Sequence, residues 1–136
     1  MSTPPTPYLL FPGNAREALT FYRDVFGGDL ALYTRAQFGR ADEPTDAIAH
    51  GTLTGSIALF GADTEAGAAG VRVEGLMLAL LGTADARTLR QWFERLADGG
   101  EIVDDLQERP WGASDGQVID RFGLHWLIGF EPEAES

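Results

Sequence analysis

The two histidines of this chain are its best candidates for chemistry near neutral pH. Imidazole titrates at about pH 6.5 and can serve as a base, an acid or a metal ligand. His50 lies in the strand-like segment Ile48 to Leu53, where we expect it to share a face with Ile48 and Thr52. It is the best catalytic candidate, although a histidine that only packs in the core would produce the same pattern.

His125 belongs to the stretch DRFGLHWLIGF, Asp120 to Phe130, which predicts a hairpin turn followed by a strand. Two histidines and a carboxylate such as Asp46, Asp63 or Asp120 could form a zinc or iron site. However, catalytic metal sites generally need three well-placed protein ligands and supporting neighbours. Asp120 is also typical of a turn residue that bonds its own backbone. We therefore expect no metal, and we expect His125 to line a pocket.

The composition excludes several kinds of chemistry. The chain has no cysteine, which rules out disulfides, thiolate nucleophiles and cysteine-held zinc or iron–sulfur sites. All ten basic residues are arginines, so a Schiff-base lysine and a P-loop of the usual kind are also ruled out. A net charge of −11 argues against nucleic acid as a partner and favours cationic small molecules over anionic ones.

The length and apolar pattern indicate a single globular domain outside the membrane. A chain of 136 residues can bury a core of its own. No apolar run approaches the roughly 20 residues that cross a bilayer, and the start of the chain lacks the basic and apolar parts of a signal peptide. We expect a cytoplasmic protein without a membrane partner.

The first half of the chain predicts a strand, a helix and three further strands. YLLF, from Tyr8, is a short buried strand. Apolar residues at three- and four-residue spacing predict a helix from Ala15 to Phe26, with Asn14 as its N-cap and two glycines after it. The strand-like segments that follow are Asp29 to Arg35, Ile48 to Leu53 and Ser56 to Gly61.

The second half repeats this order. Gly75 to Leu81 predicts a strand, and ARTLRQWFERLADGG, Ala86 to Gly100, predicts a helix that ends in two glycines like the first. Such a repeat predicts an α+β protein built from two tandem βαβββ modules, whose curved mixed sheets form a cleft with the helices outside. We place module one at about 7–61, a linker at about 62–74, module two at about 75–131 and a disordered acidic tail at 132–136.

The sequence resembles the vicinal-oxygen-chelate superfamily, which includes glyoxalases, extradiol dioxygenases and bleomycin-resistance proteins. It resembles the PhnB-like branch most closely. The matching stretches are PYLLFPGNAREALTFYRDVFGG at 7–28, DAIAHGTLTGSIALFGAD at 46–63 and LADGGEIVDDLQERPWGASDGQVIDRFGLHWLIGFE at 96–131. The resemblance implies the two-module fold and a homodimer.

The resemblance also implies where a metal would be held. Enzymes of this superfamily use His, Gln or Glu side chains, one each from the first and last strands of both modules. Here the first position falls on Pro7, and the family pattern DPxGNxxE aligns with DRFGLHWL, which puts Leu127 where glutamate would stand. Neither Ser56 to Gly61 nor residues 75–81 contain a His, Gln or Glu. All four positions lack a ligand.

We therefore expect a metal-free protein without a cofactor that binds a small molecule, cationic or aromatic, for sequestration or resistance. The alternative is a metal-dependent or His50-based lyase, isomerase or dioxygenase, so the sequence does not decide whether the protein is an enzyme. We expect Trp126 to be a core residue. The residues that we expect to bind the ligand are Tyr8, Tyr33, Arg35, Phe38, His50, Leu59, Trp111, His125 and Leu127.

Overall fold

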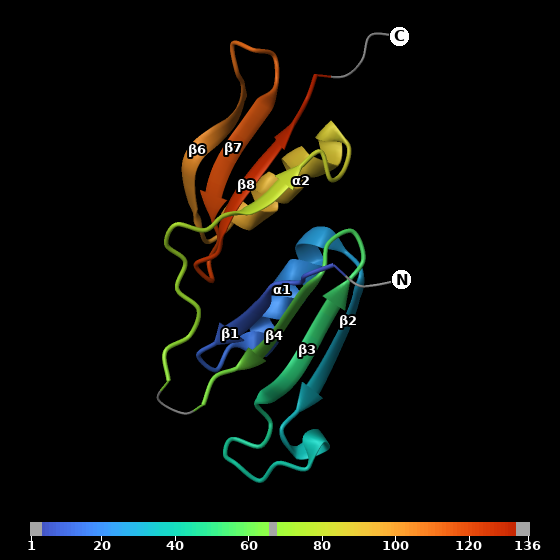
Figure 1. Ribbon diagram of the computed structural model, residues 1–136, viewed down its shortest axis with the longest axis vertical. Coiled ribbons are helices and arrows are strands. Elements are labelled where there is room, and N and C mark those ends of the chain that lie inside the picture. Colours follow the sequence, from blue (N-terminus) through green and yellow to red (C-terminus); the bar gives the residue numbers. More distant parts are fainter. Residues whose placement is uncertain (1–3, 66–67, 133–136) are drawn as a thin grey trace. The chain divides into compact units, whose positions relative to one another are not determined.

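The chain consists of two compact units, residues 1–71 and 72–136, which have the same order of elements (Figure 1). The computed structural model describes residues 4–65 and 68–132. The N-terminal module contains β1 (Tyr8–Phe11), α1 (Ala15–Phe26), β2 (Asp29–Thr34), a short 3-10 helix η1 (Ala36–Phe38), β3 (Ile48–Thr54) and β4 (Leu59–Asp63). The C-terminal module contains β5 (Leu78–Leu81), α2 (Ala86–Ala97), β6 (Glu101–Glu108), β7 (Ser114–Ile119) and β8 (His125–Phe130).

Each module has one mixed four-stranded sheet. The strand orders are β1-β4-β3-β2 and β5-β8-β7-β6. In both sheets the first strand of the module pairs in parallel with the last, and the other neighbours are antiparallel. The α+β class and the two tandem βαβββ modules are confirmed. The cleft formed by the two sheets and the single-domain organisation stay predictions.

One helix covers one face of each sheet (Figure 1), and within the described part of its own module no helix covers the other face, which we call the open face. In α1 the buried residues are those predicted by their spacing, among them Leu19, which has no exposed surface. Gly51 leaves room for it, since a Cβ atom there would lie 2.6 Å from Leu19 Cδ1. Because strand side chains alternate, the residues that do not face the helix form a separate, open surface. That surface can form a ligand-binding site.

The N-terminus of α1 is capped from a distance. Asn14, the expected N-cap, makes no side-chain cap hydrogen bond. Instead Asp63, at the end of β4, accepts hydrogen bonds from the Ala15 N–H at 2.9 Å and from the Ile48 N–H at 2.8 Å. Asn14 thus occupies the predicted N-cap position, but the side-chain hydrogen bond expected of a cap comes from a partner 48 residues away. In α2 the cap is local: Asp85 accepts from the Thr88 N–H at 2.8 Å.

A register shift at the start of β3 corrects the predicted face of Ile48. Tyr33 pairs with His50, but the next residue, Thr34, pairs with Ile48, so the strand carries one extra residue. Because Tyr33 and Thr34 point to opposite faces, so do His50 and Ile48. Ile48 is 1% exposed and lies in the core, whereas His50 is half-buried.

The remaining differences concern the ends of elements. The fourth strand begins at Leu59 rather than at Ser56, and the fifth at Leu78 rather than at Gly75. Most of the predicted disordered tail, residues 133–136, lies outside the described residues. None of the helices in the described ranges is long and apolar enough to cross a membrane.

Candidate functional site

Five rings gather on the open face of the N-terminal sheet, with His50 at their centre. The His50 ring lies 5.6 Å from Tyr8, 6.0 Å from Phe60 and 6.5 Å from Phe38, measured between centroids. Tyr33 stacks on Phe38 at 5.7 Å. We call this set, Tyr8, Tyr33, Phe38, His50 and Phe60, the aromatic face. Tyr8, Tyr33 and Phe38 are 47%, 42% and 53% exposed, so a ligand can reach the rings.

Five different elements supply the aromatic face, one residue each. The parallel pairing of β1 with β4 sets Tyr8 beside Phe60, and the antiparallel pairing of β2 with β3 sets Tyr33 beside His50. Phe38 comes from η1, whose start is fixed by two hydrogen bonds between Thr34 and Gln37. The sequence prediction included four of these residues but missed Phe60. Because side chains alternate along a strand, Phe60 could have been assigned to the face opposite that of its neighbour Leu59.

Tyr8 and His50 form a hydrogen-bonded pair. The Tyr8 hydroxyl lies 2.9 Å from Nδ1 of His50. Desolvation raises the pKa of Tyr8 above its ordinary value of 10.0, although about half of the residue is exposed, because the hydroxyl end faces the imidazole. Tyr8 therefore keeps its proton at neutral pH. In the described part of the chain, Nε2 of His50 has no hydrogen-bond partner, which leaves it for a ligand.

Arg35 and Leu59 do not belong to this surface. Arg35 is 1% exposed, and its guanidinium donates to the carbonyl oxygens of Glu43 at 3.1 Å and Thr64 at 2.8 Å. It holds the loop between η1 and β3 against the end of β4. Leu59 is 2% exposed and pairs with the buried Leu53. Both side chains lie in the interior of their module, apart from the aromatic face, and their role as ligand contacts stays a prediction.

The open face of the C-terminal sheet has a different chemistry. Nε2 of His125 lies 2.9 Å from Oε1 of Gln117, which pairs with Leu127 across the strands. Arg109 donates to Asp104 at 2.6 Å and to Asp115 at 2.8 Å. These hydrogen bonds raise the pKa of the Arg109 guanidinium, and the bond to Asp104 has the larger effect. We call this set the polar face: Asp104, Arg109, Asp115, Gln117 and His125.

The other predicted residues of this module are dispersed. Leu127 is half-buried beside the polar face. Trp111 is 72% exposed in the turn between β6 and β7, where it lines a hollow of about 280 Å³ together with residues of β5, β7 and β8. Trp126 is 1% exposed and donates to Asp120 at 2.8 Å, which confirms it as core. Asp120 also accepts from the backbone of its own turn, as predicted, at Phe122 and Leu124.

The residues at the family's metal positions do not fit a metal. Pro7 has no donor side chain and uses its carbonyl oxygen to accept from the Phe60 N–H. Strands β4 and β5 contain no His, Gln or Glu, and Leu127 is apolar. Within residues 4–65 and 68–132, no group of three or more His, Cys, Asp or Glu side chains is placed to hold an ion. We derive no step through a metal.

The chain matches a family of known proteins. The model of the family described as "Glyoxalase/Bleomycin resistance protein/Dioxygenase superfamily" matches residues 6–128. Protein YjdN of Escherichia coli (strain K12) is 30% identical over 142 residues, which cover 92% of this chain and 93% of that protein.

Two solved structures show the same fold. Protein PA1353 from Pseudomonas aeruginosa is 31% identical with a TM-score of 0.84, over 97% of this chain and 100% of that chain. A Bacillus cereus PhnB protein, described as a putative 3-demethylubiquinone-9 3-methyltransferase, is 21% identical with a TM-score of 0.73, over 94% of this chain and 99% of that one. The chain therefore belongs to the glyoxalase/bleomycin resistance protein/dioxygenase superfamily.

Proposed function

We propose that the protein binds a small organic molecule, cationic or aromatic, on the aromatic face, without a metal. The observation that carries this proposal is the ring cluster around His50. Flat, half-exposed rings stack on an aromatic ligand, and their negative faces attract an organic cation. Such a protein would act by sequestration, as a resistance protein does.

Charge supports a cationic ligand. The chain carries a net charge of −11, and no arginine belongs to the aromatic face. Arg35, the arginine nearest in sequence to Tyr33, is held in the interior by backbone carbonyls, and Arg40, the one nearest to Phe38, is paired with Asp42. The long-range field of the protein therefore raises the local concentration of cations.

A thermal-shift screen of cationic and aromatic compounds, followed by calorimetry of the hits, tests the proposal. His50→Ala removes the central ring, and we expect the affinity of a hit to fall about tenfold or more, as for the loss of a cation–π or stacking contact. His125→Ala is the matched control, since it removes the imidazole of the polar face, and should change the affinity less than about twofold. No stabilising compound, or equal losses in both variants, would overturn the proposal.

The Tyr8–His50 pair favours one alternative, an enzyme that uses proton transfer instead of a metal. Nδ1 of His50 is engaged with a phenol that keeps its proton, and Nε2 is free to exchange a proton with a substrate. Such an enzyme would be a lyase or an isomerase. His50→Ala separates the two functions, because it would abolish turnover in the enzyme and only weaken binding in a sequestration protein.

We also propose that the protein is a cytoplasmic homodimer, as the family resemblance implies. Sedimentation at micromolar concentration should show a dimer, and a monomer alone would refute this part of the proposal.

A further inference from the structure

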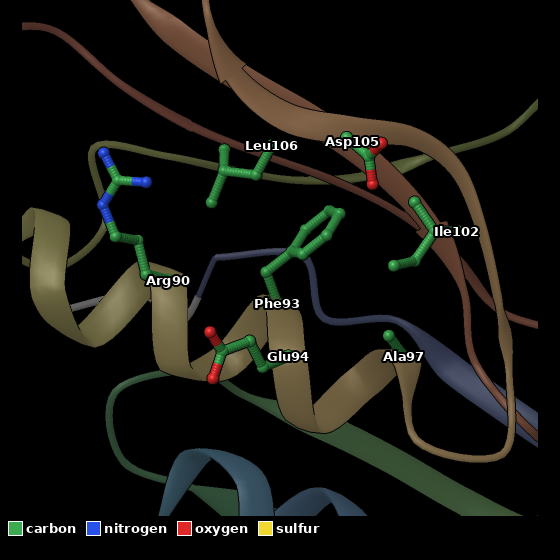
Figure 2. Close-up of a pocket in the computed structure, with 7 residues that line it drawn as sticks. All are labelled: Arg90, Phe93, Glu94, Ala97, Ile102, Asp105 and Leu106. Carbon is green, nitrogen blue, oxygen red and sulfur yellow. The ribbon is translucent and has the colours of Figure 1, made fainter.

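A second hollow lies in the C-terminal module, on the face of the sheet that carries the helix. It is a cavity of about 450 Å³ between α2 and β6, within the size range typical of ligand sites. Figure 2 shows the Phe93 ring between helix and strand, with Arg90 toward one end and Ile102 and Asp105 toward the other. The lining residues are Arg90, Phe93, Glu94, Ala97, Ile102, Asp105 and Leu106.

The duplicated module explains why space is left here. The two helices have the same length and occupy the same place in their modules, so that Phe26, the last residue of α1, corresponds to Ala97, the last residue of α2. Phe26 is 5% exposed, which means that its ring fills core space at the end of α1. Ala97 offers a single methyl group at that position. The second module thus lacks an aromatic ring at the position where the first module packs one between its helix and its sheet.

The cavity combines an apolar floor with negative charge at its edge. Phe93, Ala97, Ile102 and Leu106 supply the apolar surface. Glu94 and Asp105 have neither an ion pair nor a side-chain hydrogen bond within the described ranges. The cation of the lining, Arg90, stacks on the Phe130 ring, with 4.9 Å between Cζ and the ring centroid.

We propose that the groove between α2 and β6 is a second binding site, which takes a small organic cation with an apolar ring system. The ring would lie against Phe93 and occupy the space that Phe26 fills in the other module. The ammonium group would lie near Asp105, while Glu94, on the other side of Phe93, adds negative charge at the opposite edge (Figure 2). This site is separate from the aromatic face, since it lies in the other module and on the helix-bearing face of its sheet.

Calorimetry with tryptamine, a cation that carries an indole ring, tests this proposal on the full chain. The titration is made with the wild type and with His50→Ala, which disables the aromatic face and leaves the groove intact. We expect His50→Ala to keep one class of binding sites. Tryptophol, the neutral analogue with a hydroxyl in place of the amine, should bind that class about fivefold more weakly, since it forms no ion pair.

Variants of the lining then locate the site. In the His50→Ala background, Ala97→Phe should abolish the remaining binding by refilling the space. Tryptophan emission during urea unfolding checks that this variant is folded. Glu94→Gln and Asp105→Asn change only exposed side chains, and each should weaken tryptamine about threefold. Glu108→Gln, an exposed acid of β6 outside the groove, is the matched control and should have no effect.

Some results would overturn the proposal whatever happens at the aromatic face. These are a loss of all tryptamine binding in His50→Ala, an unchanged affinity in folded Ala97→Phe, or the same affinity for tryptophol as for tryptamine. Losses in Glu94→Gln and Asp105→Asn no larger than that of Glu108→Gln would also overturn it. If His50→Ala and wild type bind alike while Ala97→Phe does not, the groove is supported and the aromatic face is not.

Discussion

The two modules share a topology but present opposite chemistries on their open sheet faces. The aromatic face of the first carries five rings around His50, whereas the polar face of the second carries Arg109 between two aspartates and a histidine bonded to Gln117. The acidic residues are also unevenly divided, with eight in residues 1–71 and thirteen in 72–136. The shared scaffold therefore does not by itself determine the function.

The helix-bearing faces differ less. Each helix buries a stripe of apolar residues, and each module has one aspartate that accepts hydrogen bonds from more than one residue. In the first module this is Asp63, which links α1 to β3, and in the second it is Asp120, which links a turn to the indole of Trp126. The comparison predicts that these aspartates contribute to stability and that the open faces contribute to binding.

The largest expected effect is that of Asp120→Ala. It leaves buried donors of Phe122, Leu124 and Trp126 without their acceptor, which should lower the free energy of unfolding by about 3 kcal/mol. All three tryptophans lie in the second module, so their emission during urea unfolding measures this module by itself. Asp105→Ala, at an exposed position, is the control. A loss below about 0.5 kcal/mol for Asp120→Ala would break the analogy between the two aspartates.

We expect the aspartate that caps α1 to contribute more to stability than the one that caps α2. Asp63→Ala removes the acceptor for two backbone N–H groups and should destabilise the first module by about 2 kcal/mol. Asp85→Ala removes a single exposed bond at the start of α2 and should have a smaller effect. Hydrogen exchange of the α1 and α2 amides measures each helix separately. A larger effect for Asp85→Ala would show that the local cap is the more important one.

Acid should weaken the cap of α2. The hydrogen bonds to Thr88 lower the pKa of Asp85, so the folded state holds this carboxyl in its charged form. The stability that it contributes is present above the ordinary pKa of 3.8 and is lost as the pH falls through the lowered value. The protection factors of the first α2 amides, which correct for the intrinsic pH dependence of exchange, should therefore fall at low pH in wild type, and they should be less sensitive to pH in Asp85→Ala.

The smallest effect concerns Tyr8. Since desolvation raises its pKa, the folded state retains the proton, and the stability linked to it is complete below pH 10.0 and falls as the pH rises through the folded value. All three tyrosines lie in the first module. The difference between the alkaline absorbance titrations of wild type and Tyr8→Phe should have its midpoint above pH 10.0. A midpoint below that value would show that the hydroxyl is not desolvated.

Local patterns were enough to predict the scaffold. The spacing of Leu19, Tyr22 and Phe26 predicted α1, and the matching run in the second half revealed the duplication. Most of the aromatic face was also predicted, because Tyr8 and Tyr33 lie at the ends of strand-like segments and Phe38 lies in the loop that follows. These features depend on residues close together in sequence.

Several of the failures involve partners distant in sequence. No local pattern indicates that Asp63 rather than the Asn14 side chain bonds the start of α1, or that Arg35 is held in the interior by carbonyls of Glu43 and Thr64. The extra residue of β3, which turns Ile48 away from His50, depends on the register with β2. The groove beside Ala97 was missed because a small residue at the end of a helix does not by itself predict a cavity.

The central claim is that the aromatic face binds its ligand without a metal. The most direct measurement is calorimetry of benzyltrimethylammonium with chelator-treated protein, before and after addition of zinc or nickel, in wild type and Phe60→Ala. The account predicts the same affinity with and without metal, and weaker binding in Phe60→Ala. Binding that occurs only after a metal is restored would contradict it.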